Sequence, residues 1–230
     1  MKSVAIVLSA GVGRRMGADI PKQYLMLGDY PVIYYCLNAF EQSPVDEVIL
    51  VCAESDIDYC RTKIIDKYQF QKVKAIVSGG AERYDSVYRG LQEVSEDTDY
   101  VLIHDGARPM LTVDLIRRLL TQVEKEKACV PAVPATDTIK VGDEQGYAVD
   151  TPDRKTLWMV QTPQVFSYDI VKNAYEQIYQ KPSPIPITDD AMVVETYTNN
   201  RVKLVMGDYS NRKITTPEDL AIANYLLKIQ

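Results

Sequence analysis

A chain of 230 residues, 46% of them hydrophobic, can bury a sizeable core as one large domain or two small ones. The formal net charge of −6 argues against a general nucleic-acid-binding surface, and no apolar run has the length of a membrane span or the form of a signal peptide. The four cysteines form no Cys-x-x-Cys pair and accompany a single histidine, so we expect a cytoplasmic protein with reduced thiols rather than a zinc site.

The first predicted strand, residues 4–8, runs into a glycine-rich loop. Gly11 and Gly13 follow this strand, and Arg15 and Lys22 come soon after. Bare backbone N–H groups and nearby cations can bind a polyanion, so the stretch predicts a phosphate site, most simply for a nucleoside triphosphate. The alternative is a tight strand-to-helix turn with solvated charges, because neither a Walker A loop nor a complete Gly-x-Gly-x-x-Gly motif is present.

Predicted strands and helices then alternate along the first 135 residues. Strands are expected at 48–52, 73–77, 100–103 and 128–133, and helices at 31–40, 55–68 with Ser55 as N-cap, 82–94 and 113–127. This pattern predicts a Rossmann-like α/β fold, with a mostly parallel sheet covered by helices on both faces. Ligands of such sheets bind beyond the carboxyl ends of the strands, where Gly11, Gly80 and Asp105 lie. His104 alternates away from Asp105, which indicates a core position.

The alternation breaks at residues 136–159, which read as a β-hairpin arm. Two short polar and apolar alternations flank a turn cluster at 142–146. Because an isolated ribbon is marginally stable, we expect the arm to pack on a second subunit, the alternative being its own domain. The remaining elements are helices at 168–179, 189–197 with Thr188 as cap, and 217–227, a connector at 181–186 and a strand at 202–206. With no repeat or linker, residues 1–230 are interpreted as a single domain.

Seven short motifs are spread in order over essentially the whole chain. They are SAGVGRRM at 9–16, PKQY at 21–24, GGAERYDSV at 79–87, HDGARP at 104–109, QTPQVF at 161–166, TDDA at 188–191 and KITTPEDL at 213–220. The first resembles the signature of nucleotidyltransferases that activate sugars and polyols. Together they resemble the 2-C-methyl-D-erythritol 4-phosphate cytidylyltransferase family of the non-mevalonate isoprenoid pathway. The resemblance implies a fold of the nucleotide-diphospho-sugar transferase type and Mg²⁺-dependent transfer of CMP from CTP to a polyol phosphate, with release of pyrophosphate.

The resemblance also implies roles for particular residues. Those implied to contact the nucleotide are Ala10, Gly11, Gly13, Arg15, Lys22, Gly80, Ser86 and Asp105. Those implied to contact the polyol phosphate are Asp105, Arg108, Thr138, Arg154, Thr162, Thr188 and Lys213. Arg15, Lys22, Arg154 and Lys213 are the implied catalytic cations, and Asp105 would hold Mg²⁺ directly or through water. If Thr138 and Arg154 reach a neighbour's site from the arm, the active form is a homodimer.

Three other functions remain open at this point. Ribitol-5-phosphate cytidylyltransferase of teichoic-acid synthesis shares most of the motifs, although Asp153-Arg154 and the 213–220 motif favour the erythritol enzyme. A CTP-binding protein that has lost catalysis is disfavoured by the intact cations and by Asp105. A dinucleotide-dependent oxidoreductase is disfavoured by the incomplete glycine motif.

Overall fold

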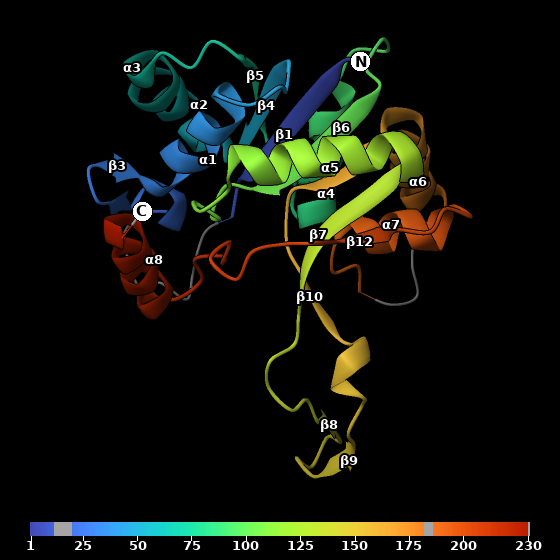
Figure 1. The fold of residues 1–230 in the computed structure, drawn as a ribbon. Coiled ribbons are helices and arrows are strands. Elements are labelled where there is room, and N and C mark those ends of the chain that lie inside the picture. Colours follow the sequence, from blue (N-terminus) through green and yellow to red (C-terminus); the bar gives the residue numbers. More distant parts are fainter. Residues whose placement is uncertain (12–19, 182–185, 230) are drawn as a thin grey trace.

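A mixed β-sheet runs through the centre of the protein, seen in a computed structural model that describes residues 1–11, 20–181 and 186–229 (Figure 1). In these residues eight strands form the sheet, in the order β10-β7-β11-β6-β1-β4-β5 with β12 also paired to β7. The strands are β1 Ser3–Ser9, β4 Glu47–Cys52, β5 Val73–Ser78, β6 Tyr100–Asp105, β7 Ala128–Pro134, β10 Trp158–Val160, β11 Gln164–Ser167 and β12 Lys203–Met206. β1 runs parallel to both β4 and β6, which confirms the predicted mostly parallel α/β sheet.

Two antiparallel strands were not predicted, and a buried polar residue explains one of them. β11 lies antiparallel between β6 and β7, and β10 pairs antiparallel with β7. β11 begins at Gln164, which is buried although its amide is polar, because it donates to Asp189 and accepts from the backbone of Ala191. Because the strand has only four residues, one buried polar residue is enough to break the apolar pattern that would predict it. A separate two-stranded ribbon, β2 Met26–Leu27 and β3 Tyr30–Pro31, was also not predicted.

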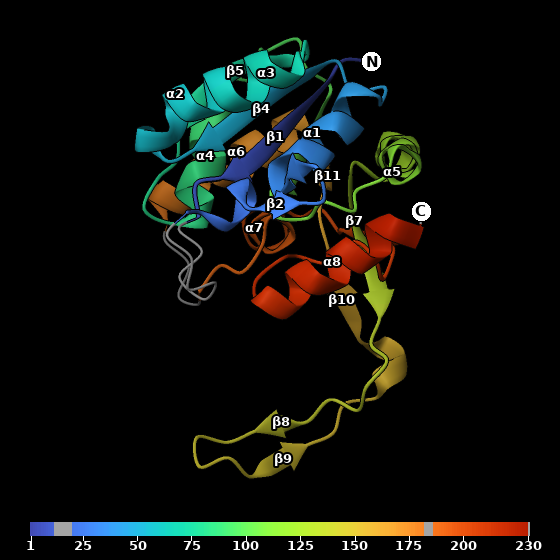
Figure 2. The ribbon, with the colours of Figure 1, turned by 90° about the vertical axis from the view of Figure 1, so that its left-hand side faces the viewer.

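Helices cover both faces of the sheet, as predicted (Figures 1 and 2). They are α1 Val32–Glu41 and α5 Val113–Glu126 on one face, and α4 Arg83–Gln92, α6 Tyr168–Gln180 and α7 Asp190–Tyr197 on the other. The last helix, α8 Pro217–Ile229, packs instead with β2 and the start of α1. Side chains of β1 alternate between the two layers. Ala5 and Val7 pack with the apolar residues of α1 and α5, whereas Val4 and Ile6 pack with those of α4, α6 and α7. The central parallel strands β1, β4 and β6 are thereby buried on both faces.

Two predicted helix caps are wrong. Ser55 lies inside the 3-10 turn Glu54–Asp56, and its hydroxyl donates to the Asp56 carboxylate instead of capping a helix. The predicted helix behind it is divided into α2 Ile57–Tyr59, the π-helical segment Cys60–Ile65 and α3 Asp66–Tyr68. Thr188 does not cap α7, because the neighbouring Asp189 carboxylate accepts from Met192 N.

The predicted arm at residues 136–159 stands away from the sheet (Figures 1 and 2). Its tip is the two-stranded ribbon of β8 Val141–Gly142 and β9 Ala148–Asp150, and β10 returns it to the body. The hairpin is confirmed, although its strands are shorter than the alternation predicted. Tyr147 is 72% exposed and Val149 is 62% exposed, so the tip does not fold back onto its own chain.

The cysteines are structural in character. All four are free thiols in buried positions, which confirms the predicted core packing of Cys52 and Cys129. Burial raises the pKa of the Cys129 thiol to about 12. Within the residues described, we find no helix with the length and apolar character that a membrane crossing requires.

Candidate active site

A cavity of about 260 Å³ opens at the carboxyl ends of β1, β5 and β6. This is the place that the sheet topology predicts for a ligand. The sequence-predicted residues that line it are Ala10, Gly11, Lys22, Gly80, Ser86, Asp105 and Lys213. Gly13 and Arg15 lie outside the described residues. Segments from both ends of the chain therefore meet at one site.

A buried glutamine joins the end of β1 to the segment that carries Lys22. Gln23 lies in the 3-10 turn Lys22–Tyr24 and is 3% exposed. Its side-chain amide donates to the backbone oxygens of Ser9 at 2.5 Å and Gly11 at 3.3 Å. These two bonds fix the turn beside the strand end, so Lys22 borders the cavity. Sequence reasoning missed Gln23, which carried no signal beyond its place after Pro-Lys.

The Gly79–Gly80 loop is close-packed, and its glycines are needed for space. A Cβ on Gly79 would lie 2.4 Å from the Cβ of Ala10, and one on Gly80 would lie 2.2 Å from the Cβ of Asp85. The Gly80 N–H donates to the Ser86 hydroxyl at 3.0 Å. The loop is thus held against the first turn of α4, with Gly80 and Ser86 both at the cavity wall. These glycines thus allow the backbone of the loop to pack closely against the protein's own side chains, Ala10 and Asp85.

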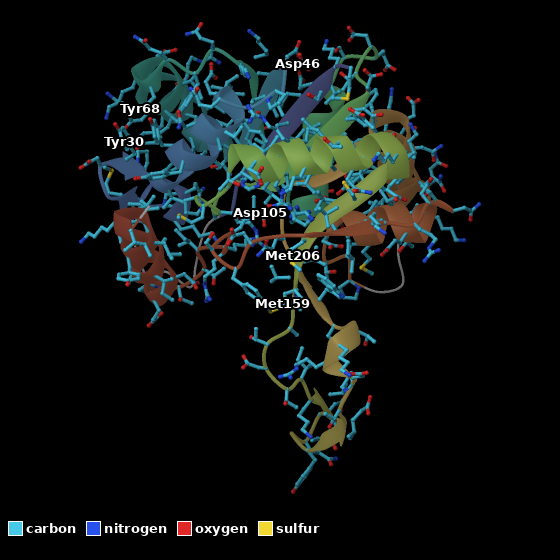
Figure 3. All side chains as sticks on the ribbon, viewed as in Figure 1. Tyr30, Asp46, Tyr68, Asp105, Met159 and Met206 are labelled. Carbon is cyan, nitrogen blue, oxygen red and sulfur yellow. The ribbon has the colours of Figure 1, made fainter. Side chains whose placement is uncertain are left out.

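Asp105 is the electrostatic centre of the site, at the end of β6 (Figure 3). Its carboxylate lies 2.8 Å from Lys213 Nζ, 3.3 Å from Arg83 Nε and 3.8 Å from Arg108 Nε. Burial by itself would raise the pKa of Asp105. The three cations outweigh burial and hold this pKa well below its usual range, so the carboxylate is ionised.

Arg83 is the site residue that sequence reasoning missed. It lines the cavity, and its guanidinium forms two bonds of 2.8 Å to the carboxylate of Asp190, which is fully buried. The Tyr175 hydroxyl also donates to Asp190. Such a bidentate pair fixes the orientation of the guanidinium as well as its position. A signal existed, because Arg83 begins α4, where a cation opposes the helix dipole.

The loop behind Asp105 is locked by a buried threonine and a buried histidine. The Thr162 hydroxyl accepts from Asp105 N at 3.1 Å and lies 3.0 Å from His104 Nδ1. His104 Nε2 lies 3.3 Å from the backbone oxygen of Arg108. Burial lowers the pKa of His104 to about 4, so the ring is neutral near pH 7. The predicted core position of His104 is confirmed.

A C-terminal segment closes over the same loop. Arg108 Nη1 donates to the backbone oxygen of Asn211 at 2.7 Å, and Ile214 N donates to Ala107 O at 2.8 Å. Asn211 is buried, and its side-chain amide donates to Thr162 O at 2.9 Å. Lys213 lies within this segment and is thereby carried to Asp105.

The other predicted substrate residues lie apart from the cavity wall. Thr138 and Arg154 belong to the arm, where Arg154 Nη1 donates to Thr136 O at 2.7 Å. Thr188 is exposed before α7, and Thr162 is buried under Asp105. None of the arm residues that the structure describes lines the cavity within this single chain.

The site suits the binding of a polyanion. Lys22, Arg83 and Lys213 supply positive charge, and the ends of β1 and β5 lead into backbone that can approach a ligand closely. In the described wall there is no histidine or cysteine to act as a nucleophile or base. In the described parts of the chain no three His, Cys, Asp or Glu side chains gather as a metal site. The cations of the wall are suited to hold phosphate groups in fixed positions.

Comparisons with known proteins match this chain to a single family over nearly its full length. Residues 3–229 match the family model described as IspD, 2-C-methyl-D-erythritol 4-phosphate cytidylyltransferase. The chain is 53% identical over 227 residues to the protein of that name from Lachnospira eligens, covering 98% of this chain and 99% of the relative. It is 45% identical to the protein of the same name from Lachnoclostridium phytofermentans, covering 99% and 97%.

Solved structures agree with this similarity. The 4-diphosphocytidyl-2C-methyl-D-erythritol synthase of Anaerococcus prevotii matches with a TM-score of 0.86 and 33% identity, covering 99% of this chain and 96% of that one. The 2-C-methyl-D-erythritol 4-phosphate cytidylyltransferase of Thermus thermophilus matches with a TM-score of 0.79 and 28% identity, covering 99% and 100%. Sequence, fold and site therefore lead to one conclusion: the chain belongs to the IspD family of 2-C-methyl-D-erythritol 4-phosphate cytidylyltransferases.

Proposed function

We propose that this chain transfers CMP from CTP to 2-C-methyl-D-erythritol 4-phosphate, forming 4-diphosphocytidyl-2-C-methyl-D-erythritol and releasing pyrophosphate. The observation that carries the proposal is the cluster of Lys22, Arg83, Asp105 and Lys213 around one cavity, in a member of this family. It is the reaction of the cytidylyltransferases to which the chain is similar over nearly its full length. Residues 1–230 act as a single nucleotidyltransferase domain.

The chemistry is an in-line displacement at phosphorus. An oxygen of the methylerythritol phosphate forms a bond to the α-phosphorus of CTP while the bond from that phosphorus to the β-phosphate oxygen breaks. Negative charge spreads over the phosphoryl oxygens and passes to pyrophosphate. The protein has to align two anions and stabilise this charge, which requires fixed cations and backbone donors.

The nucleotide occupies the side of the cavity formed by β1 and β5. Ala10, Gly11 and Gly13 follow the nucleotide, and Arg15 and Lys22 bind its phosphates and stabilise the transition state. Gly80 and Ser86 meet the cytosine and the ribose. Support comes from the packing of the Gly79–Gly80 loop, which leaves its backbone at the cavity wall.

Lys213 and Asp105 act as a pair on the acceptor side. Lys213 positions the attacking phosphate, and the ion pair with Asp105 holds the ammonium group in place before the substrate arrives. Arg108 and Thr188 complete the binding of the polyol phosphate, whereas Thr162 supports the site from behind Asp105. Because the Thr162 hydroxyl already accepts from Asp105 N, its contribution is to fix the loop.

Thr138 and Arg154 reach the acceptor from a second copy of the chain. Their arm stands away from its own body with exposed apolar side chains at its tip, including Tyr147 and Val149. In a homodimer these side chains would be covered, and Arg154 would supply a further cation to the neighbour's polyol phosphate. The site is then shared between two subunits.

The carboxylate of Asp105 suits Mg²⁺, which is usually held by one or two carboxylates together with substrate phosphates. Both Asp105 oxygens already face cations, Oδ1 at Arg83 and Oδ2 at Lys213, so Asp105 would hold the ion through water. When bound, Mg²⁺ supplies charge neutralisation to the triphosphate. The free thiols support a place in the cytoplasm, and the net charge of −6 supports work on small molecules without a nucleic-acid partner.

The experiment is pyrophosphate release with CTP and Mg²⁺, run in parallel with methylerythritol phosphate and with ribitol 5-phosphate. Turnover of the first substrate alone is the expected result. Turnover of ribitol phosphate alone would assign the chain to wall-polymer synthesis. Binding of CTP without turnover of either acceptor would indicate a non-catalytic homologue.

A further inference from the structure

Tyr179, near the end of α6, reaches across to the start of α4. Its hydroxyl donates to Asp85 Oδ1 at 2.7 Å, and its ring packs against Tyr88 with the ring centroids 4.9 Å apart. Burial and the Asp85 carboxylate raise the pKa of Tyr179, so the hydroxyl keeps its proton and can donate throughout the neutral range. Tyr179 does not line the cavity, so an effect of its hydroxyl on a ligand passes through Asp85, to which the hydroxyl donates.

Asp85 connects Tyr179 to the start of α4. Its other oxygen, Oδ2, accepts from Glu82 N at 3.0 Å, and the Glu82 side chain accepts in return from Asp85 N. This reciprocal capping box fixes the first turn of the helix. Because the two oxygens of one carboxylate hold Tyr179 and Glu82, the tyrosine hydroxyl fixes the rotation of the group that caps α4.

The position of this first turn sets the position of the cavity wall. The Ser86 hydroxyl accepts from Gly80 N at 3.0 Å and donates to Glu82 O at 3.3 Å. Gly80 packs so closely on Asp85 that a Cβ there would lie 2.2 Å from the Asp85 Cβ. Gly80, Ala81 and Glu82 all line the cavity. A displacement of Asp85 therefore moves the wall.

We infer that Tyr179 is a positioning residue for the nucleotide: through Asp85 it holds the 79–82 loop in the form that receives CTP. The inference rests on the proposed function, in which Gly80 and Ser86 contact CTP. A loop that is ordered before binding loses less conformational freedom when the ligand arrives. Loss of the hydrogen bond from Tyr179 to Asp85 weakens the binding of CTP. The acceptor side of the cavity, with Lys213 and Asp105, stays intact.

The test is steady-state kinetics of Tyr179→Phe, which keeps the ring on Tyr88 and removes only the hydroxyl. We expect the KM for CTP to rise about threefold to tenfold, which corresponds to one lost hydrogen bond. The kcat and the KM for methylerythritol phosphate stay at the wild-type values. The matched control is Tyr197→Phe, which removes a hydroxyl that donates to Lys181 O at 2.7 Å beside the end of α6 and leaves all constants unchanged.

A second variant tests the route through Asp85. Asp85→Ala raises the KM for CTP, and Tyr179→Phe adds nothing further in that background. An unchanged KM for CTP in folded Tyr179→Phe overturns the inference, as does an effect that multiplies with that of Asp85→Ala. If the wild-type protein turns over neither acceptor, the proposed function fails. The role of the Tyr179 hydroxyl is then tested by calorimetry, which measures the affinity of each protein for CTP alone. A weaker affinity in Tyr179→Phe then supports it, and an unchanged affinity overturns it.

Discussion

At the scale of single residues, the ionised Asp105 matters because it holds cations in place before any phosphate is present. Lys213 lies 2.8 Å from it, and Arg83 joins it to the fully buried Asp190. Pre-set charges need no reorganisation when negative charge moves during the reaction. Lys22 adds a further positive charge to the cavity wall.

Replacement of Lys22 by alanine tests this use of charge. We expect Lys22→Ala to lower kcat by about 10²- to 10³-fold, or about 3–4 kcal/mol, because a cation near the transferred phosphoryl group is lost. Arg15→Ala should behave in the same way. The melting temperature stays near the wild-type value. Lys63→Ala, on the exposed surface of the π-helical segment, is the control for charge alone. Near-normal turnover of both active-site variants would contradict the proposed roles.

Arg83→Lys tests the bidentate link to Asp190. A lysine keeps the charge but cannot bond to both oxygens of Asp190 and still face Asp105. We expect kcat/KM to fall by more than about tenfold and the free energy of unfolding to fall by about 2 kcal/mol, because a buried carboxylate loses part of its pairing. Enzyme kinetics and urea denaturation measure the two effects. Wild-type values in both would show that the charge alone suffices.

His104 gives the protein a specific dependence on pH. Its pKa is about 4 in the folded protein and about 6.5 when exposed, so the unfolded chain binds the proton more tightly. Stability is therefore complete above about pH 6.5 and falls as the pH drops towards 4, by about 3 kcal/mol. Because the chain has one histidine, the NMR signals of the His104 ring identify themselves and report its pKa. A ring that titrates near pH 6.5 in the folded protein would refute this.

At the scale of elements, the central strands of the sheet could be predicted because strands buried on both faces consist almost entirely of apolar residues. β1, β4 and β6 are apolar on both faces and read as strands without further help. β11 could not be found in this way, since Gln164 occupies a buried position by bonding to Asp189 and Ala191 N, residues that lie later in the chain. Arg83 could be suspected from its place at the start of α4, but its partner could not be predicted, because Asp190 is 107 residues away and spacing does not reveal such pairs.

Helix α4 packs on the sheet through a glycine. An added Cβ on Gly90 would lie 2.6 Å from Ile6 Cγ2 and 3.2 Å from Val51 Cγ2. Alanine favours a helix by about 1 kcal/mol, but overpacking a core costs about 1–3 kcal/mol. We expect Gly90→Ala to lower the free energy of unfolding by up to about 2 kcal/mol, measured by urea denaturation. Gly142→Ala, where the added atom meets only Tyr147 O at 3.8 Å, is the control. A more stable Gly90→Ala protein would contradict this, because it would show that α4 can shift away from Ile6 at a cost in free energy smaller than the gain in helix propensity.

At the scale of the whole molecule, the arm decides whether a site is built from one chain or two. If Arg154 acts in the neighbour's site, subunits with Arg154→Ala complement subunits with Lys213→Ala. In an exchanged mixture half the dimers are mixed, and one of the two sites in each contains both wild-type residues. We expect about a quarter of wild-type activity from the mixture and almost none from either variant alone. No recovery, with subunit exchange shown by mass, would place Arg154 and Lys213 in sites of their own chain.

The segment that closes over Asp105 is also made much later than the loop that it covers. Arg108 and Asn211 are joined by a hydrogen bond although 103 residues separate them. The ribosome makes Gly11, Gly80 and Asp105 first, and at about 5–20 residues per second Asn211 follows Arg108 by about 5–20 seconds. Lys213 comes two positions later still. A nascent chain that already contains Asp105 therefore lacks, for that interval, the ammonium group of Lys213 that lies 2.8 Å from the Asp105 carboxylate in the folded protein.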